Sequence, residues 1–457
     1  MILWRYRFLY LCLFFLTESH VLYAQDVLPQ GVIFYQYLYR HLTSPAYKYD
    51  ETGTRKPIGE MFSRVLSGPE LLNGNGGSLM QTLAQEIKKY DGADNGPNSL
   101  SNKLYLGTIT GDIKGKMTGQ GIGFGIGITD HLSIFVGVPI VSVSVDANLV
   151  YNGEGNNAAQ IKEELGDIAF DELKDGLNQA AGLNQAKIEE QIASYEYAPL
   201  GKWQKSGIGH VVTGVRMGWI RELSRAWSYG FGPAVSLTFP TGYKKNPDIL
   251  QDVGFGEPYY SLGTNIDQKF SLLKRFHVGV HTGYVLNLSN SIERRVPEGA
   301  EQLVPASRKS AVKITPGDDT DVALSLKFTV PFFEIGIRSG IKRHYNDTYN
   351  GSLDGNYRTL GKGSDKEVFY NHLSLSFETL SAFMAKKFSF PFLLTFAARV
   401  PMKSRNMVDT ERYYELNFSS FLPTPWMEEK KKDAEDVKDK EHKQRKKKHP
   451  KKADRPF

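Results

Sequence analysis

Apolar and polar residues alternate along most of the chain, and this two-residue period predicts β-strands with one apolar face. From Gly121 to Ile128 every second residue is glycine, and the residues between are isoleucine or phenylalanine. The same period marks further segments at 226–240, 318–329, 332–345 and 391–402. We therefore predict an all-β protein whose strands are apolar on one face and small, polar or charged on the other.

Apolar and polar residues alternate in the strands of soluble sandwiches and of membrane barrels alike, so alternation does not distinguish the two folds. Strand length and the lengths of the connections do. The candidate strands run to roughly 11–17 residues, whereas soluble strands are mostly about five or six and a membrane strand needs about 9–11. Short turns are expected at 129–131, 222–225, 273–274, 330–332 and 388–391. Longer loops alternate with them at 41–102, 147–205, 241–256, 291–317, 346–367 and 403–410. Short turns on one side and long loops on the other are typical of outer-membrane barrels.

This pattern predicts an antiparallel up-and-down transmembrane β-barrel of about twelve strands, with fourteen as the alternative. The strands are expected near 31–40, 103–128, 132–146, 206–221, 226–240, 257–271, 275–289, 318–329, 332–345, 368–386, 391–402 and 411–421. Segment 103–128 is long enough for a bulge or for two strands. Two long loops carry helical spacing of apolar residues, at Ser78–Tyr90 and Asn157–Tyr195. We expect these helices to be extracellular caps or inward lids, or to face solvent with no gating role.

The N-terminus has the features of a secretory signal peptide. Arg5 and Arg7 precede an apolar run from Phe8 to Leu16, and a cleavage point follows Ala24. Cys12 lies inside this segment and is the one cysteine of the chain, so the mature protein is expected to have no disulfide. No later apolar run reaches the roughly 18 residues of a spanning helix. We therefore expect the protein to be exported from the cytoplasm of a Gram-negative bacterium to the outer membrane.

The net charge of +6 is concentrated in a C-terminal tail. Glu428–Phe457 holds 13 Lys/Arg and 8 Asp/Glu with almost no apolar residue, which predicts a disordered tail. On the periplasmic side it is expected to contact cell-wall polymer or anionic lipid, or to have no specific partner. Nucleic acid is not an expected partner, because the chain is exported. The predicted domains are a signal peptide at 1–24, a barrel at 25–422 and the tail at 423–457.

Alternation also assigns side chains to the lumen. Unpaired charge facing lipid costs about 2–4 kcal/mol at mid-membrane, so charged residues within strands are expected to point inward. This assigns to the lumen Arg216, Asp267, Lys269, His277, His281, Lys327, Glu334, Arg338, Lys342 and Arg399. These residues predict either a net-positive pore wall that orients anionic solutes or an internal salt-bridge network that fills the barrel.

Other chemistry has weak signals in the sequence. His277 and His281 lie about 13 Å apart along an extended strand, which is too far for one metal ion. The acidic run 317–321 is expected to be a solvated turn rather than a Ca²⁺ site. No G-x-S-x-G elbow or H-E-x-x-H pair is present, so we predict no enzyme and no cofactor. A hydrolase triad assembled from separate strands remains an alternative.

Three short motifs resemble an outer-membrane family named for phenol degradation in the MetA pathway. Gly127–Ile134 resembles its G-L-T-D-x-L turn, and Leu237–Gly242 resembles its L-P-T-G strand end. Gly207–His210 resembles its G-x-G-D strand start, with His210 in place of Asp. The resemblance covers roughly 100–402 and links the chain loosely to fatty-acid and aromatic-hydrocarbon transporters. It implies a barrel that takes up small apolar or aromatic molecules, although an N-terminal plug is absent and the predicted lumen is charged.

The sequence therefore predicts an outer-membrane channel or transporter for a small solute. A structural barrel with a filled lumen, surface loops and a periplasmic tether is the first alternative, and a barrel hydrolase is the second. Outer-membrane lipid and the barrel assembly machinery are expected partners. Leu416 and Phe418 in the last strand are the candidate assembly signal, because a charged tail precedes the terminal Phe457.

Overall fold

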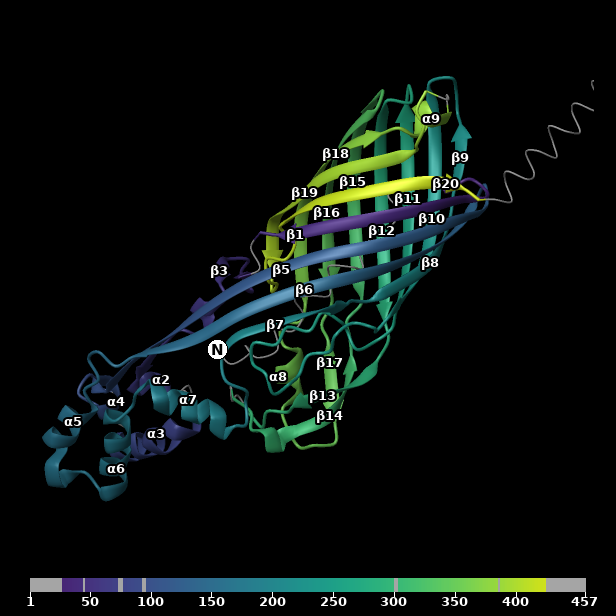
Figure 1. The fold of residues 1–457 in the computed structure, drawn as a ribbon. Coiled ribbons are helices and arrows are strands. Elements are labelled where there is room, and N and C mark those ends of the chain that lie inside the picture. The colour runs from purple at the N-terminus through teal and green to yellow at the C-terminus, as the bar shows by residue number, and fades with distance from the viewer. Residues whose placement is uncertain are drawn as a thin grey trace, which may run out of the picture.

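The computed structural model describes residues 27–424 except 44–45, 73–76, 93–95, 300–302 and 385–386. The predictions of a signal peptide and of a charged C-terminal tail fall almost wholly outside these residues. Within them, twelve antiparallel strands form a closed ring, as the sequence predicted (Figure 1). The ring strands are β1 (Val32–Leu42), β5 (Tyr105–Thr129), β6 (Leu132–Asn152), β8 (Val211–Met217), β10 (Trp227–Phe239), β11 (Ser261–Leu272), β12 (Phe276–Asn287), β15 (Asp319–Val330), β16 (Phe333–His344), β18 (Lys366–Glu378), β19 (Phe392–Arg405) and β20 (Tyr413–Pro423).

The first and last strands close the ring. β1 pairs with β20 from Val32↔Pro423 to Leu42↔Tyr413, and it pairs with β5 on its other edge. Three strands extend the sheet outside the ring, where β4 (Arg64–Ser67) pairs with β5, β7 (Gly201–Ile208) with β6, and β9 (Trp219–Glu222) with β10. Among the described residues every ring strand therefore has a partner on both edges, which removes the open edges of a sheet.

Outward-facing side chains are apolar and exposed, and aromatic residues gather at both rims. The middle of β15, for example, exposes Val322, Leu324 and Leu326. The short-turn rim exposes Trp219, Trp227, Phe276, Phe332, Phe333, Phe388 and Phe390, and the long-loop rim exposes Tyr260, Tyr284, Tyr345 and Tyr414. An apolar band between two aromatic girdles is the surface of a barrel that spans a lipid bilayer.

The short turns lie where the sequence predicted them, with one exception. Leu273 and Lys274 have φ of 53° and 55°, the left-handed conformation of a two-residue hairpin turn. The exception is the strand predicted to reach residue 386, which ends at Glu378. The Thr379 hydroxyl accepts a hydrogen bond from the Phe392 N–H (2.9 Å), and helix α9 (Leu380–Met384) follows. This side-chain contact ends the ladder, so the β18–β19 connection is longer than predicted.

The strand predicted at 206–221 is broken into β7, β8 and β9. At the first break, the His210 ring accepts a hydrogen bond from the Glu257 N–H, and its Nδ1 donates to the Phe239 carbonyl (2.9 Å). At the second break, a side chain on Gly218 would lie 2.5 Å from Val27 Cγ2. Both breaks therefore occur where a distant segment contacts the strand.

The long loops form two structures on the extracellular side. β5 and β6 continue beyond the ring and carry a helical lobe, at the lower left of Figure 1. The lobe contains α2 (Gly68–Leu72), α3 (Gly77–Asp91), α4 (Leu100–Lys103), α5 (Ala158–Leu165), α6 (Asp171–Ala181) and α7 (Gln185–Ser194). Its own apolar core includes Leu83, Ile87, Leu173 and Leu177. The two helical segments predicted in the loops are therefore present.

The second structure, here called the cover, consists of the described parts of loops 240–260, 288–318 and 345–365. It contains a small sheet of β13 (Asn290–Arg295), β14 (Lys309–Thr315) and β17 (Thr348–Gly351), together with α8 (Tyr357–Gly361). Its core includes Tyr259, Val296, Val312 and Leu360. Figure 1 shows these elements at the end of the barrel opposite α9. A two-stranded hairpin, β2 (Tyr47–Tyr49) and β3 (Arg55–Pro57), lies in the first long loop.

Candidate functional site

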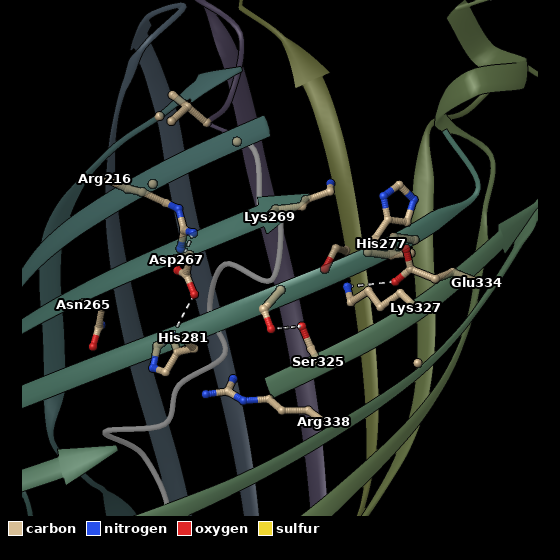
Figure 2. Close-up of a pocket in the computed structure, with 18 of the residues that line it drawn as sticks. Arg216, Asn265, Asp267, Lys269, His277, His281, Ser325, Lys327, Glu334 and Arg338 are labelled. Carbon is tan, nitrogen blue, oxygen red and sulfur yellow. Dashed lines mark hydrogen bonds and ion pairs between the residues drawn. The ribbon is translucent and has the colours of Figure 1, made fainter. Parts of the chain in front are cut away.

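The barrel encloses a cavity of about 1280 Å³. Nine of the ten residues that the sequence assigned to the lumen line it, from strands β8, β11, β12, β15 and β16. They are Arg216, Asp267, Lys269, His277, His281, Lys327, Glu334, Arg338 and Lys342. Figure 2 shows eight of them on the inner wall. The two-residue period is sufficient to place them, because it fixes the face of each strand on which they lie.

A band of contacting side chains, here called the lumenal belt, crosses this wall. It begins with Arg216 on β8, whose Nη2 donates to Asp267 Oδ2 on β11 at 2.7 Å. His281 on β12 lies directly across from Asp267 in the ladder, and its Nδ1 donates to the other carboxylate oxygen at 2.7 Å (Figure 2). One carboxylate therefore joins an imidazole on the neighbouring strand β12 and a cation on β8, which is separated from β11 by β10.

The belt continues through Asp321 on β15. Its carboxylate lies 3.7 Å from His281 Nε2, and it accepts hydrogen bonds from Arg338 Nη2 (3.2 Å) and the Tyr370 hydroxyl (3.1 Å). Asp321 is not among the residues assigned to the lumen from the sequence. Asp321 has the same strand parity as Lys327, so the two-residue period places both side chains on the inner face. Tyr370 has the same strand parity as the lining residues His372 and Ser374, but its contact with Asp321 depends on how the strands pair.

Arg399 has the same strand parity as the lining residues Leu393 and Thr395, but it does not itself line the cavity. Its guanidinium stacks on the Tyr370 ring at 3.5 Å, and its Nε lies 2.8 Å from Glu411 Oε2. The side chain is 1% exposed, since the aromatic ring and the carboxylate cover it. Arg399 and Glu411, which lies in the β19–β20 loop, therefore form a buried pair at the end of the lumenal belt.

A second ion pair lies toward the periplasmic end of the cavity. Lys327 Nζ on β15 is 2.9 Å from Glu334 Oε1 on β16. Nearby, His277 Nδ1 contacts the Ser271 hydroxyl at 2.8 Å. The described residues contain no group of three or more His, Cys, Asp or Glu side chains suited to hold a metal ion.

The cavity wall is not net positive, in contrast to the prediction from the sequence. Its described lining includes five Lys/Arg and seven Asp/Glu residues. The acidic residues that the prediction left out are Asp130, Asp319, Asp321, Glu378 and Glu415. Several of them lie at the strand ends, where the two-residue pattern gives way to loop sequence.

Part of the lumen is filled rather than hollow. Arg40 on β1 forms a 2.7 Å ion pair with Glu415 on β20, and both side chains are almost fully buried. The Tyr413 ring packs 4.0 Å from the Arg40 guanidinium. The two alternatives for the lumen, a lined space and internal ion pairs that fill it, are thus both present in this barrel.

Residues from outside the ring line the periplasmic end of the cavity. At the periplasmic end these are Val27–Pro29, together with Leu380 and Phe383 of the β18–β19 connection. Gly127 permits the close approach of the N-terminal segment, because a side chain there would lie 2.1 Å from the Pro29 carbonyl. The lining contains no described residue of the helical lobe.

At the extracellular end a buried histidine joins the barrel to the cover. His344 Nδ1 lies 3.0 Å from Asp319 Oδ1 on β15, and its Nε2 lies 3.1 Å from Asp347 Oδ1 in the cover. Asp347 also accepts a hydrogen bond from the Gly317 N–H at 2.9 Å. The cover is therefore attached directly to the strand ends above the cavity.

Comparison with known proteins gives a likeness of structure only. No protein-family model matches the chain, and no curated protein matches it in sequence. An outer membrane channel from Pseudomonas putida F1 aligns with a TM-score of 0.45 and 12% identity, over 88% of this chain and 98% of that one. The translocator domain of the autotransporter NalP from Neisseria meningitidis aligns with a TM-score of 0.30 and 8% identity, over 87% and 89%.

The described residues contain no helix long and apolar enough to cross a membrane.

The location of the chain follows from its own surface and topology. A closed ring of twelve strands with an apolar outer band satisfies every backbone group within the membrane, and such closed barrels are the β-structures that span bilayers. The chain is an outer-membrane β-barrel with a partly hollow, charged lumen.

Proposed function

We propose that this barrel is a channel or transporter that carries a small solute across the outer membrane. The observation that supports the proposal most directly is the cavity of about 1280 Å³ inside the ring. Sites for small molecules typically measure about 300–1,000 Å³, so this space admits a small organic solute with water. Barrels of about eight strands are filled by side chains, and those of 16–18 strands hold open channels, so twelve strands suit a cavity of intermediate size.

The first experiment is single-channel conductance of the purified, refolded protein in a planar lipid bilayer. We expect discrete conductance steps, because a lumen lined by ionised side chains holds water and ions. Heat-modifiable mobility on a gel serves as the control for a folded barrel. A folded protein that is silent in the bilayer and excludes small sugars in liposome-swelling assays would contradict the proposal and favour a purely structural barrel.

A further inference from the structure

The cavity has two chemically different walls. The wall formed by β8, β11, β12, β15 and β16 carries the charged part of the lumenal belt. The facing side is contributed by the N-terminal segment and by β1, β19 and β20. It presents the apolar side chains of Leu28, Phe34, Leu393 and Phe421. It also presents the uncharged polar residues Gln36, Thr395, Asn417 and Ser419, and Glu415, which pairs with Arg40. A solute that touches both walls therefore meets the charged belt on one side and a mostly uncharged, partly apolar surface on the other.

Basic and acidic groups alternate along the charged wall. Arg216, Asp267, His281, Asp321 and Arg338 follow one another, and successive members lie between 2.7 and 3.7 Å apart. Each basic group of this series therefore has a carboxylate within reach. A solute with a single charge has to compete for a group that already has a partner, and it leaves the displaced partner uncompensated in a partly buried site.

We propose that the transported solute is a small dipolar amphiphile, an inference that rests on the proposed function. It carries one cationic and one anionic group close together on an apolar body. Its anionic group replaces a carboxylate beside Arg216 or Arg338, and its cationic group replaces a basic group beside Asp267 or Asp321. Each broken pair is thus exchanged for a new pair, and the apolar body packs on the facing wall.

The test compares three probes that share one aromatic body. L-Phenylalanine carries both charges, 3-phenylpropanoate carries only the negative charge, and 2-phenylethylamine carries only the positive charge. Uptake of each is measured into liposomes that contain the full-length protein at neutral pH. We expect L-phenylalanine to enter about tenfold faster than either singly charged probe, the ratio that corresponds to ~1.4 kcal/mol.

A double variant links this preference to the belt. Asp321→Asn with Arg338→Gln removes one charge of each sign from the cavity, and we expect the preference for L-phenylalanine to fall to about twofold or less. The matched control is Arg343→Gln with Glu367→Gln. These two residues form a 2.5 Å ion pair between an arginine and a carboxylate on β16 and β18, and Arg343 is exposed outside the cavity. This control variant should keep the full preference.

The outcomes separate the solute class from the proposed function. Equal uptake of all three probes would overturn the dipolar solute and leave the channel in place. A preference that persists in the Asp321/Arg338 double variant with normal heat-modifiable mobility would also overturn it. Exclusion of all three probes by a folded protein that is silent in the bilayer would overturn both proposals.

Discussion

At the scale of single residues, Arg295 shows how one buried cation holds several loops together. It forms a 2.7 Å ion pair with Asp248, and its Nη atoms donate to the carbonyls of Tyr195 (2.6 Å) and Val304 (2.9 Å). The Tyr197 ring stacks 3.8 Å from the guanidinium. These contacts join the end of α7 to two loops of the cover. Arg295 is buried while Asp248 is about a third exposed, so removal of Asp248 leaves a buried guanidinium with fewer partners.

The ion pair between Arg295 and Asp248 predicts that the stability of the cover depends on pH. Burial raises the pKa of Asp248, but hydrogen bonds from Lys309 and Arg295 outweigh this effect and hold the pKa below its usual value. The carboxylate therefore stabilises the cover above the ordinary Asp pKa of about 4, and this contribution is lost as the pH falls through the lowered value. Amide hydrogen exchange at residues 195–197 should be slow at pH 6 and faster at pH 3, after correction for intrinsic rates. Asp248→Asn should be fast at both, and an unchanged pH response in this variant would contradict the assignment.

The charged residues of the cavity lining predict the ion selectivity of the pore. Replacing Arg338 and Lys342 with Gln removes two of the five basic residues of the lining and leaves all seven acidic ones. We expect the ratio of cation to anion permeability to rise by about tenfold, the lower end of the effect of a charged cleft on local ions. The measurement is the reversal potential in a KCl gradient. Arg343→Gln, on the outer face of β16, should leave it unchanged. An open pore with the same reversal potential in the double variant would exclude these two residues from the permeation wall.

At the scale of elements, the helical lobe is a folded unit with its own core. Helix α6 contacts both α3 and α5, which come from different loops of the chain. Its inner residues Leu173 and Leu177 are fully buried. No described residue of the lobe lines the cavity. The lobe is therefore expected to fold and unfold without changing the barrel.

This expectation is tested by placing a charge in the core of the lobe. Leu173 is 0% exposed, so Leu173→Asp buries an unpaired carboxylate, which is expected to unfold the lobe. Ile168 lies in the same lobe and is 77% exposed, so Ile168→Asp should have little effect. Limited trypsin digestion should cut within 153–200 only in the first variant, while heat-modifiable mobility of the barrel stays normal in both. Loss of the folded barrel in Leu173→Asp would show that the lobe is required for it.

At the scale of the whole molecule, lipid covers the outside of the ring, and packed apolar cores lie in the lobe and the cover. The outer side chains of the ring are apolar and exposed, whereas the largest fully buried side chain among the described residues is that of Arg399. This is the reverse of a soluble sandwich, and it makes the depth of a residue in the membrane the main influence on its tolerance to charge.

A pair of arginine substitutions tests this orientation. Leu324 in the middle of β15 is 52% exposed, and Tyr345 at the extracellular rim is 50% exposed. Leu324→Arg should lower the free energy of unfolding from lipid vesicles by about 2–4 kcal/mol, and Tyr345→Arg by about 0–1 kcal/mol. Reversible guanidinium unfolding followed by tryptophan fluorescence measures both. Equal costs at the two positions would contradict the inferred membrane depth.

The sequence by itself determined the number of strands, their approximate ends and the faces of nine lumenal residues. These features are local, since a two-residue period places Lys327 and Arg338 on the inner face whatever their neighbours are. The same period does not reveal where a distant segment interrupts a strand. It therefore missed the ends of β8 at His210 and Gly218, each of which depends on a contact more than 40 residues away.

The tertiary structure alone decided how the charges are paired. Arg216 and Asp267 are 51 residues apart, and Tyr370 and Asp321 are 49 apart, so their contacts depend on the stagger of the closed ring. Arg399 does not line the cavity because the Tyr370 ring and the Glu411 carboxylate cover its side chain. Alternation along each strand fixes which side chains face the lumen, whereas the register between strands fixes which of them meet. The lumenal belt is a product of that register.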